Sequence, residues 1–333
     1  MFGMATPAAP PTAIDQQLER HRRELTGYCY RMLGSWYEAE DAVQETMVRA
    51  WKNLDKLESP DALKSWMYRI ATNVSYDMLD GAKRRARPMD LNESVTADST
   101  LDAGLPENLW LMPAPDARVL PESGDPAELA AARETIKLAF VAALQHLPPR
   151  QRAVLILREV LRWQAAEVAE LLDTSVASVN SALQRARATL DQAAPDASGP
   201  AEPEGDDARQ QELFARYVDC FERYDVAQLV TLLHDDATFQ MPPFELWLRG
   251  PEEVGRWMLG QGIACKDAIV RRTWANGCPA IGIYKDDDGA GIFRPFNLMV
   301  IEMAGGEITG IHNFLYPHLF PAFGLPAEIP TEG

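Results

Sequence analysis

A short stretch near the middle of the 333-residue chain carries side chains that suit contacts with DNA. If the residues from about 176 onward form a helix, Val176, Val179, Leu183 and Ala186 fall on one side of it. The opposite side carries small, polar and basic residues: Ser175, Ala177, Ser178, Asn180, Ser181, Gln184, Arg185 and Arg187. Asn and Gln side chains can pair with adenine, and Arg with guanine or with phosphate. An ordinary solvated helix face has the same composition, so this pattern alone leaves both interpretations open.

The elements around this stretch predict how it is held. Residues 147–152 read LPPRQR, which starts a helix with proline in its first turn and includes Arg150. A second short helix is expected over 164–172, and a tight turn at 172–175 joins it to the helix above. Two short helices joined by a tight turn form a helix-turn-helix, whose second helix enters the major groove of DNA.

The net charge of −17 is unusual for a DNA-binding protein, because such proteins gain affinity when basic groups displace phosphate counterions. The charge is unevenly distributed along the chain. Residues 130–190 carry eight Lys and Arg against five Asp and Glu, whereas residues 195–333 carry ten against twenty-two. A weakly basic unit in an acidic protein should bind free DNA poorly, so we expect a partner to hold it on the duplex.

Two stretches interrupt the helical pattern and divide the chain. Residues 88–125 are rich in Pro, Ser, Asp and Glu, which predicts an acidic, mobile and extended linker. Residues 193–207 have the composition of a flexible tether. Three folded units are then expected: two helical units, 12–87 and 126–192, and a last unit, 208–325, in which a long helix precedes strand-like runs.

Cysteine spacing and hydropathy argue against several classes of protein. Cys29, Cys220, Cys265 and Cys278 are scattered without a Cys-x-x-Cys pair, which argues against a zinc site and a disulfide framework. No apolar run approaches the roughly 20 residues of a membrane-spanning helix. We therefore expect a cytoplasmic protein with no metal, no cofactor and no membrane partner.

Motifs in both helical units resemble the extracytoplasmic function (ECF) sigma factors. The LPPRQR stretch, residues 165–172 and the SVASVNSALQRAR stretch at 175–187 resemble region 4 of that family, which recognises the −35 promoter element. The stretches EDAVQETMVRAW at 40–51 and WMYRIATNVSYD at 66–77 resemble region 2, in the family's order and spacing. The resemblance implies an alternative sigma factor with two all-α domains, a region 2 helical bundle and a region 4 helix-turn-helix.

The same resemblance implies partners, namely core RNA polymerase, through its largest-subunit clamp and its flap region, and promoter DNA. In region 2, the helix that starts near residue 40 would dock on the clamp, while Val43, Met47 and Ala50 turn inward. The docking residues would be Asp41, Gln44, Glu45, Arg49 and Trp51. An ordinary solvated helix face is the alternative.

The helix expected at 61–80, with the basic run after it, would melt and recognise the −10 element, which requires polar groups near unpaired bases. The candidate −10 residues are Lys64, Arg69, Asn73, Lys83, Arg84 and Arg85. Trp66 is expected in the core. The acidic linker would occupy the polymerase channel that later holds nascent RNA, although a plain tether explains its composition equally well.

The last unit resembles the SnoaL-like members of the cone-shaped α+β fold shared with ketosteroid isomerase and nuclear transport factor two (NTF2). The resemblance lies in YVDCFERYDVAQLV at 217–230, LHDDATF at 233–239 and residues 308–320. Such folds enclose an apolar pocket, here expected to be lined by Tyr217, Trp247, Trp257 and His312. We expect no catalytic residues and a regulatory role, through contact with the helical units and a bound small molecule.

Two other functions remain open on the sequence. One is a helix-turn-helix regulator that acts without polymerase, against which the region 2 resemblance argues. The other is a SnoaL-like isomerase or cyclase that its helical part tethers to DNA.

Overall fold

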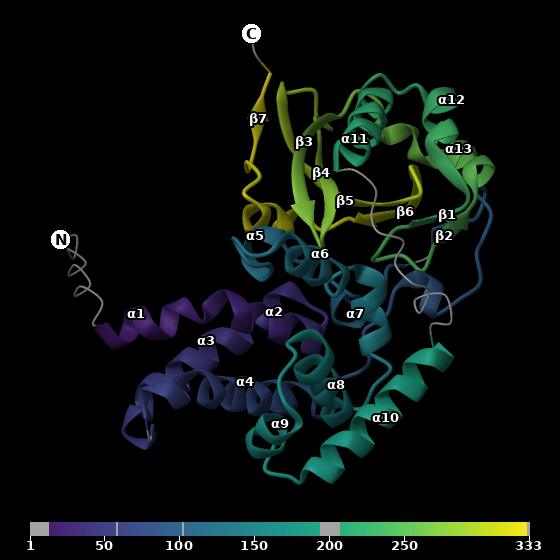
Figure 1. The fold of residues 1–333 in the computed structure, drawn as a ribbon. Coiled ribbons are helices and arrows are strands. Elements are labelled where there is room, and N and C mark those ends of the chain that lie inside the picture. The colour runs from purple at the N-terminus through teal and green to yellow at the C-terminus, as the bar shows by residue number, and fades with distance from the viewer. Residues whose placement is uncertain (1–12, 58, 102, 194–206, 332–333) are drawn as a thin grey trace, which may run out of the picture.

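The computed structural model describes residues 13–57, 59–101, 103–193 and 207–331, and its first unit is a bundle of four helices (Figure 1). These are α1 (Ala13–Arg20), α2 (Arg22–Leu33), α3 (Trp36–Lys52) and α4 (Leu63–Leu79). Gly34 ends α2 because its left-handed backbone, with φ of 71°, lets its N–H bond to the carbonyl of Tyr30. The predicted inner face of α3 is confirmed, since Val43, Met47 and Ala50 are buried.

The second helical unit contains the expected helix-turn-helix. Its helices are α6 (Pro126–Glu134), α7 (Leu138–Leu144), α8 (Pro149–Leu155), α9 (Ala165–Leu171) and α10 (Val176–Ala193). Pro149 occupies the first turn of α8, and a capping box of Gln164 and Glu167 starts α9. A π-helical turn, Ile156–Val160, follows α8.

The C-terminal unit is a mixed sheet covered by helices, which confirms the α+β prediction. Its helices are α11 (Asp207–Glu222), α12 (Val226–Leu229) and α13 (Pro251–Leu259). Its strands are β1 (Leu233–Gln240), β2 (Trp247–Arg249), β3 (Ile269–Ala275), β4 (Cys278–Lys285), β5 (Ile292–Ala304), β6 (Glu307–Phe314) and β7 (Ile329–Pro330). The sheet order is β2-β1-β6-β5-β4-β3, with β1 parallel to β6, and β7 pairs with β5.

The two faces of this sheet belong to two different cores. Met299, Ile301 and Ile311 lie on the face that α11 covers, and the Tyr217 hydroxyl of α11 contacts the sulfur of Met299 at 3.2 Å. Leu298, Val300 and Phe314, on the alternate positions, lie in a second core. That second core also contains residues from outside the sheet: Trp110, Met112, Leu138, Leu319 and Phe320.

The expectation of a mobile, extended linker at 88–125 is wrong for this structure. The segment contains short helical turns: Pro88–Asp90, Glu107–Leu109 and α5 (Asp116–Val119). Trp110 and Met112 are fully buried, and Val95 N–H bonds to the carbonyl of Trp247 in the C-terminal unit. Acidic residues dominate the composition, but the apolar run at 109–112 is sufficient to dock the segment, because burying a large side chain contributes roughly 2 kcal/mol. We call residues 80–125 the joining segment.

The two helical units share one hydrophobic core. Tyr68 of α4 packs against Trp163 of the second unit with ring centroids 5.0 Å apart, and the same cluster includes residues from Leu18 to Ala186. The Arg69 guanidinium also donates to the carbonyl of Glu170 at 2.8 Å. Most of the expected tether at 193–207 lies outside the described residues. Within the described parts of the chain, every helix is too short or too polar to cross a bilayer.

Candidate DNA and polymerase interfaces

The outer face of α10 has the geometry of a recognition helix. Val179, Leu183 and Ala186 anchor it to the core, whereas Val176, expected to lie inside, is 42% exposed because it occupies the first turn. Ser175 starts the helix, since its hydroxyl accepts from the N–H of Ser178 at 3.2 Å. All the predicted base-facing side chains of α10 are exposed: Ser175, Ser178, Asn180, Ser181, Gln184, Arg185 and Arg187. Arg187 additionally pairs with Glu159.

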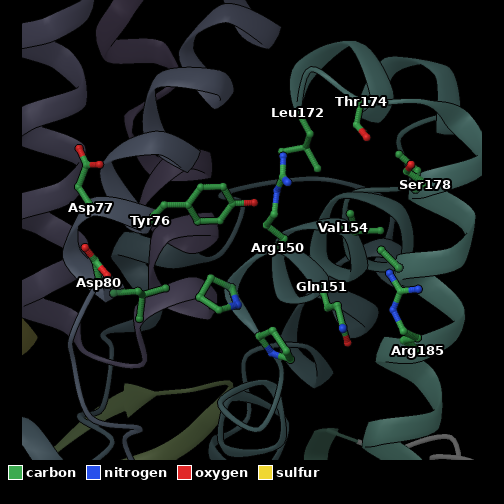
Figure 2. Close-up of a pocket in the computed structure, with 15 residues that line it drawn as sticks. Tyr76, Asp77, Asp80, Arg150, Gln151, Val154, Leu172, Thr174, Ser178 and Arg185 are labelled. Atoms are coloured by element: carbon green, nitrogen blue, oxygen red, sulfur yellow. The ribbon is translucent and has the colours of Figure 1, made fainter.

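Part of this face lies opposite the first helical unit. A groove of about 800 Å³ separates the end of α4 from α8 and α10, and Figure 2 shows the Tyr76 hydroxyl pointing toward Arg150. Burial raises the pKa of Tyr76 to about 12, although the neighbouring Arg150 acts in the other direction. Ser178 and Arg185 line the same groove. DNA can therefore reach three of the −35 candidates, Arg150, Ser178 and Arg185, only when the first helical unit does not cover this groove.

The predicted polymerase-docking residues share the outer face of α3. Asp41, Gln44 and Glu45 are exposed, and Trp51 is 60% exposed, which is unusual for so large an apolar side chain. Arg49 joins this face to α4, because it pairs with Glu45 at 2.7 Å and with Asp77 at 3.3 Å. An exposed tryptophan beside acidic groups is typical of a protein-binding surface.

The predicted −10 residues are held in several ways. Lys64 pairs with Glu24 at 2.8 Å, and Arg69 is bonded to the second helical unit as described above. Asn73 and Lys83 are exposed. Arg84 lies against His146, with a guanidinium nitrogen 2.6 Å from Nδ1 of the ring. Trp66 is half-buried against the shared core, close to the position expected for it.

Arg85 does not have the geometry of a DNA contact. It is 7% exposed, pairs with Glu38 and donates to the carbonyl of Trp110 at 2.8 Å. Its guanidinium thereby fastens the joining segment to α3. The basic run at 83–87 therefore combines an exposed part with a buried, structural part, which sequence composition does not separate.

The four predicted pocket residues do not lie together. Tyr217 and Trp257 are buried in the core under α11, and burial raises the pKa of Tyr217 well above its usual value. His312 and Trp247 lie on the opposite face of the sheet, because they occupy the alternate strand positions to Ile311 and Leu248. His312 contacts Gln240 and Glu302 there, and the indole of Trp247 donates to the carbonyl of Asn92 at 2.8 Å.

Two buried arginines that hold the helical units together were not among the predicted residues. Arg31 donates to the carbonyl of Thr135 at 2.9 Å, and Arg152 donates to the carbonyl of Met32. Each is 4% exposed, and burial lowers the pKa of each to about 10. The helical spacing of each arginine from its apolar neighbours places it on the inner face of α2 or α8. This spacing is the sequence signal that could have identified both residues as buried.

An exposed polar and basic helix face in a helix-turn-helix, together with a separate face that exposes a tryptophan beside acidic groups, is typical of a DNA-binding transcription factor that works with a protein partner. Comparison with known families agrees with this class. Residues 18–85 match the family described as Sigma-70 region 2, and residues 137–190 match Sigma-70, region 4.

Two proteins of Mycobacterium tuberculosis are similar to most of the chain. The ECF RNA polymerase sigma factor SigG is 42% identical over 317 residues, covering 93% of this chain and 83% of SigG. SigJ, another ECF RNA polymerase sigma factor, is 29% identical over 255 residues, covering 73% and 72% of the two chains. The crystal structure of SigJ superposes with a TM-score of 0.60 at 24% identity, covering 93% of this chain and 99% of that one, so the likeness of fold extends through all three units.

The chain belongs to the ECF sigma factors. It is an alternative sigma factor that directs transcription initiation, and it carries an α+β unit after region 4.

Proposed function

We propose that this sigma factor contacts the −35 element through α10, contacts the −10 element through α4 and the exposed residues after it, and docks on core polymerase through α3. The proposal rests on one observation, namely that the two exposed faces are separate. Trp51 and its acidic neighbours lie on one helical unit, and the outer face of α10 lies on the other. A factor of this design can hold polymerase and promoter at the same time.

The two helical units must separate for this function. The −10 and −35 elements lie about 25 base pairs apart, or about 85 Å at 3.4 Å per base pair. Units that share a core and are joined by Arg69, Arg31 and Arg152 cannot span that distance. We therefore assign the described arrangement to the free protein, and we expect polymerase to open it.

The C-terminal unit is proposed to modulate this opening. Its sheet packs against Trp110 and Met112 of the joining segment and Leu138 of α7, and its β3–β4 turn contacts α2. Opening the helical units therefore disturbs contacts with the C-terminal unit. We propose no catalysis there, because the buried Tyr217 hydroxyl contacts Met299 while His312 lies across the sheet.

The test is promoter-selective transcription in vitro with purified core polymerase and a library of genomic fragments. The full chain is expected to start transcription at sites that the core alone ignores. Truncation near residue 191 is a poor comparison, because it uncovers Trp110, Met112 and Leu138. Asn276→Gly, which weakens the β3–β4 turn contact without removing the unit, is the better variant.

Failure of the full chain to direct initiation at any fragment would contradict the proposed use of the α3 and α10 faces. A loosened Asn276→Gly variant that initiates as strongly as the parent would contradict the modulating role of the C-terminal unit. A change in initiation strength of severalfold, in either direction, would support it.

A further inference from the structure

A groove of about 600 Å³ lies where three parts of the chain meet, and its residues carry unusual charge. We call it the junction groove. It is lined by residues of the first helical unit, by two stretches of the joining segment, within 81–85 and 106–109, and by Gln145, Pro149 and Arg152 of the second helical unit. Its polar and charged lining residues are Glu38, Lys83, Arg84, Arg85, Asn108, Gln145 and Arg152. Its volume falls in the range of small-molecule sites.

The groove is strongly cationic within an acidic protein. Four cations line it, Lys83, Arg84, Arg85 and Arg152, against the single carboxylate of Glu38. Glu38 is already paired with Arg85. In a chain with a net charge of −17, the other three cations, which have no carboxylate partner in the groove, require an explanation.

The floor of the groove contains a buried cation without an anionic partner. Arg152 is 4% exposed and donates to carbonyl oxygens of Met32, Gln145 and Leu147 and to the side chain of Gln145. Its Nε has no hydrogen-bond partner, and no carboxylate among the described residues pairs with it. A buried charge usually has a counterion, since burial of an unpaired ion is costly.

The pKa of the neighbouring His146 responds to the same positive charges. His146 lies against Arg84, and its pKa is lowered by burial first and by the positive charge of Arg84 second, with Arg87 and Arg152 acting in the same direction. Only Asp90, which is paired with Arg87 at 3.0 Å, acts in the other direction. An anion bound in the groove would offset the positive charge of these arginines and would therefore raise the pKa of His146.

We propose that the junction groove binds a small phosphate-bearing molecule, which bridges region 2, the joining segment and region 4. Guanidinium groups bind phosphate through paired N–H donors, and Lys83 and Arg84 offer exposed donors at the rim. A DNA duplex fits this site poorly, because Arg85 and Arg152 are more than nine-tenths buried. Since all three segments contribute, a bound ligand would stabilise the arrangement in which the helical units share a core.

Isothermal titration calorimetry on the full chain tests this proposal, with inorganic phosphate, pyrophosphate and adenosine diphosphate as probes at about 0.15 M salt, where surface charges are largely screened. The double variant Lys83→Gln with Arg84→Gln removes the two positive charges at the rim of the groove. Both side chains are exposed, so the fold should be retained. Arg216→Gln, an exposed cation on α11, is the matched control. We expect saturable binding of at least one probe, weakened at least tenfold in the double variant and unchanged in the control.

A second readout separates binding in the groove from a structural effect. Saturating pyrophosphate should raise the pKa of His146, followed by NMR titration of its ring protons, in the parent and in the control. Absence of saturable binding by all three probes would overturn the proposal, as would equal affinity in the double variant. Binding of a 12-nucleotide single strand, without binding of any small probe, would also overturn it in favour of a nucleic-acid surface.

Discussion

Asn276, in the turn between β3 and β4, donates a hydrogen bond of 2.7 Å to the hydroxyl of Tyr30, which lies 246 residues earlier in the chain. The Asn276 side chain also donates to the carbonyl of Ile136 at 2.8 Å and accepts from the N–H of Ala114 at 2.9 Å. It is fully buried. One amide therefore joins the C-terminal unit to α2, to the joining segment and to the chain just before α7.

Removal of this amide should destabilise the whole assembly. Asn276 has a positive φ of 56°, so glycine retains the backbone conformation while it removes the three side-chain bonds. At about 1 kcal/mol for each buried bond, we expect Asn276→Gly to lower the free energy of unfolding by about 2–4 kcal/mol. Denaturant titration followed by tryptophan fluorescence measures this change.

Asn92→Ala serves as the matched control for that measurement. The Asn92 amide also joins the joining segment to the C-terminal unit, since it donates to Glu245 at 2.8 Å, but the contact is exposed. We expect a loss of less than about 0.5 kcal/mol, as is usual for surface positions. If both variants lose the same stability, the buried turn is not the contact that joins the units.

Asp116 should make the same junction sensitive to pH. Its carboxylate accepts from the N–H of Gly277 at 2.8 Å, and burial raises its pKa to about 6 despite that bond and the nearby Arg133. An acid whose pKa is raised on folding stabilises the fold below its unfolded pKa of 3.8, and this stabilisation is lost as the pH rises through about 6. At neutral pH the ionised, buried carboxylate of Asp116 therefore lowers the free energy of unfolding.

Asp116→Asn should remove this cost, because the amide oxygen can accept the same bond. We expect the variant to be more stable than the parent by about 1–3 kcal/mol at pH 7.5 and to differ little at pH 4. Thermal unfolding of both proteins at the two pH values measures the difference. A variant that is less stable at pH 7.5 would show that the ionised carboxylate is favourable at this position.

Local patterns were sufficient to predict the helical faces. The spacing of Val179, Leu183 and Ala186 placed the outer side of α10 correctly, because the helical period depends only on neighbouring residues. The α+β class of the last unit was predicted from strand-like runs after a long helix, and the particular folds were predicted from the resemblance to known families. Composition failed for the joining segment, since averaging over its acidic residues concealed the apolar Trp110 and Met112.

Contacts between distant segments were beyond sequence reasoning. Nothing near Asn276 indicates that its partners are Tyr30 and Ile136, because those contacts arise only when the three units pack together. Strand alternation shows that His312 and Ile311 face opposite sides of a sheet. It does not show which of the two sides α11 covers, and the structure places Ile311 on that side. Arg85 was assigned to DNA from its charge, whereas its partner Glu38 lies 47 residues away.

The recognition role of α10 predicts a specific loss of promoter contact. Gln184 is exposed at the centre of the outer face, where its amide can pair with a base edge. We expect Gln184→Ala to reduce initiation at a −35-dependent promoter about tenfold, because one base contact contributes about 1–3 kcal/mol. Gln211→Ala, an exposed glutamine on α11, is the matched control and should have no effect. Equal initiation by both variants would mean that Gln184 does not contact a base.

Trp51 provides the corresponding test of the polymerase-docking face. Its indole is 60% exposed next to an acidic helix face, and burial of such a side chain at an interface often contributes 2 kcal/mol or more. We expect Trp51→Ala to weaken binding to core polymerase by about 30-fold while the free energy of unfolding changes little, because the side chain makes few contacts within the chain. Trp274→Ala is the control, since Trp274 is 47% exposed on the C-terminal unit, away from α3. Fluorescence anisotropy with labelled sigma factor and unlabelled core measures both affinities. If the Trp274 variant binds more weakly than the Trp51 variant, the docking surface lies on the C-terminal unit instead of α3.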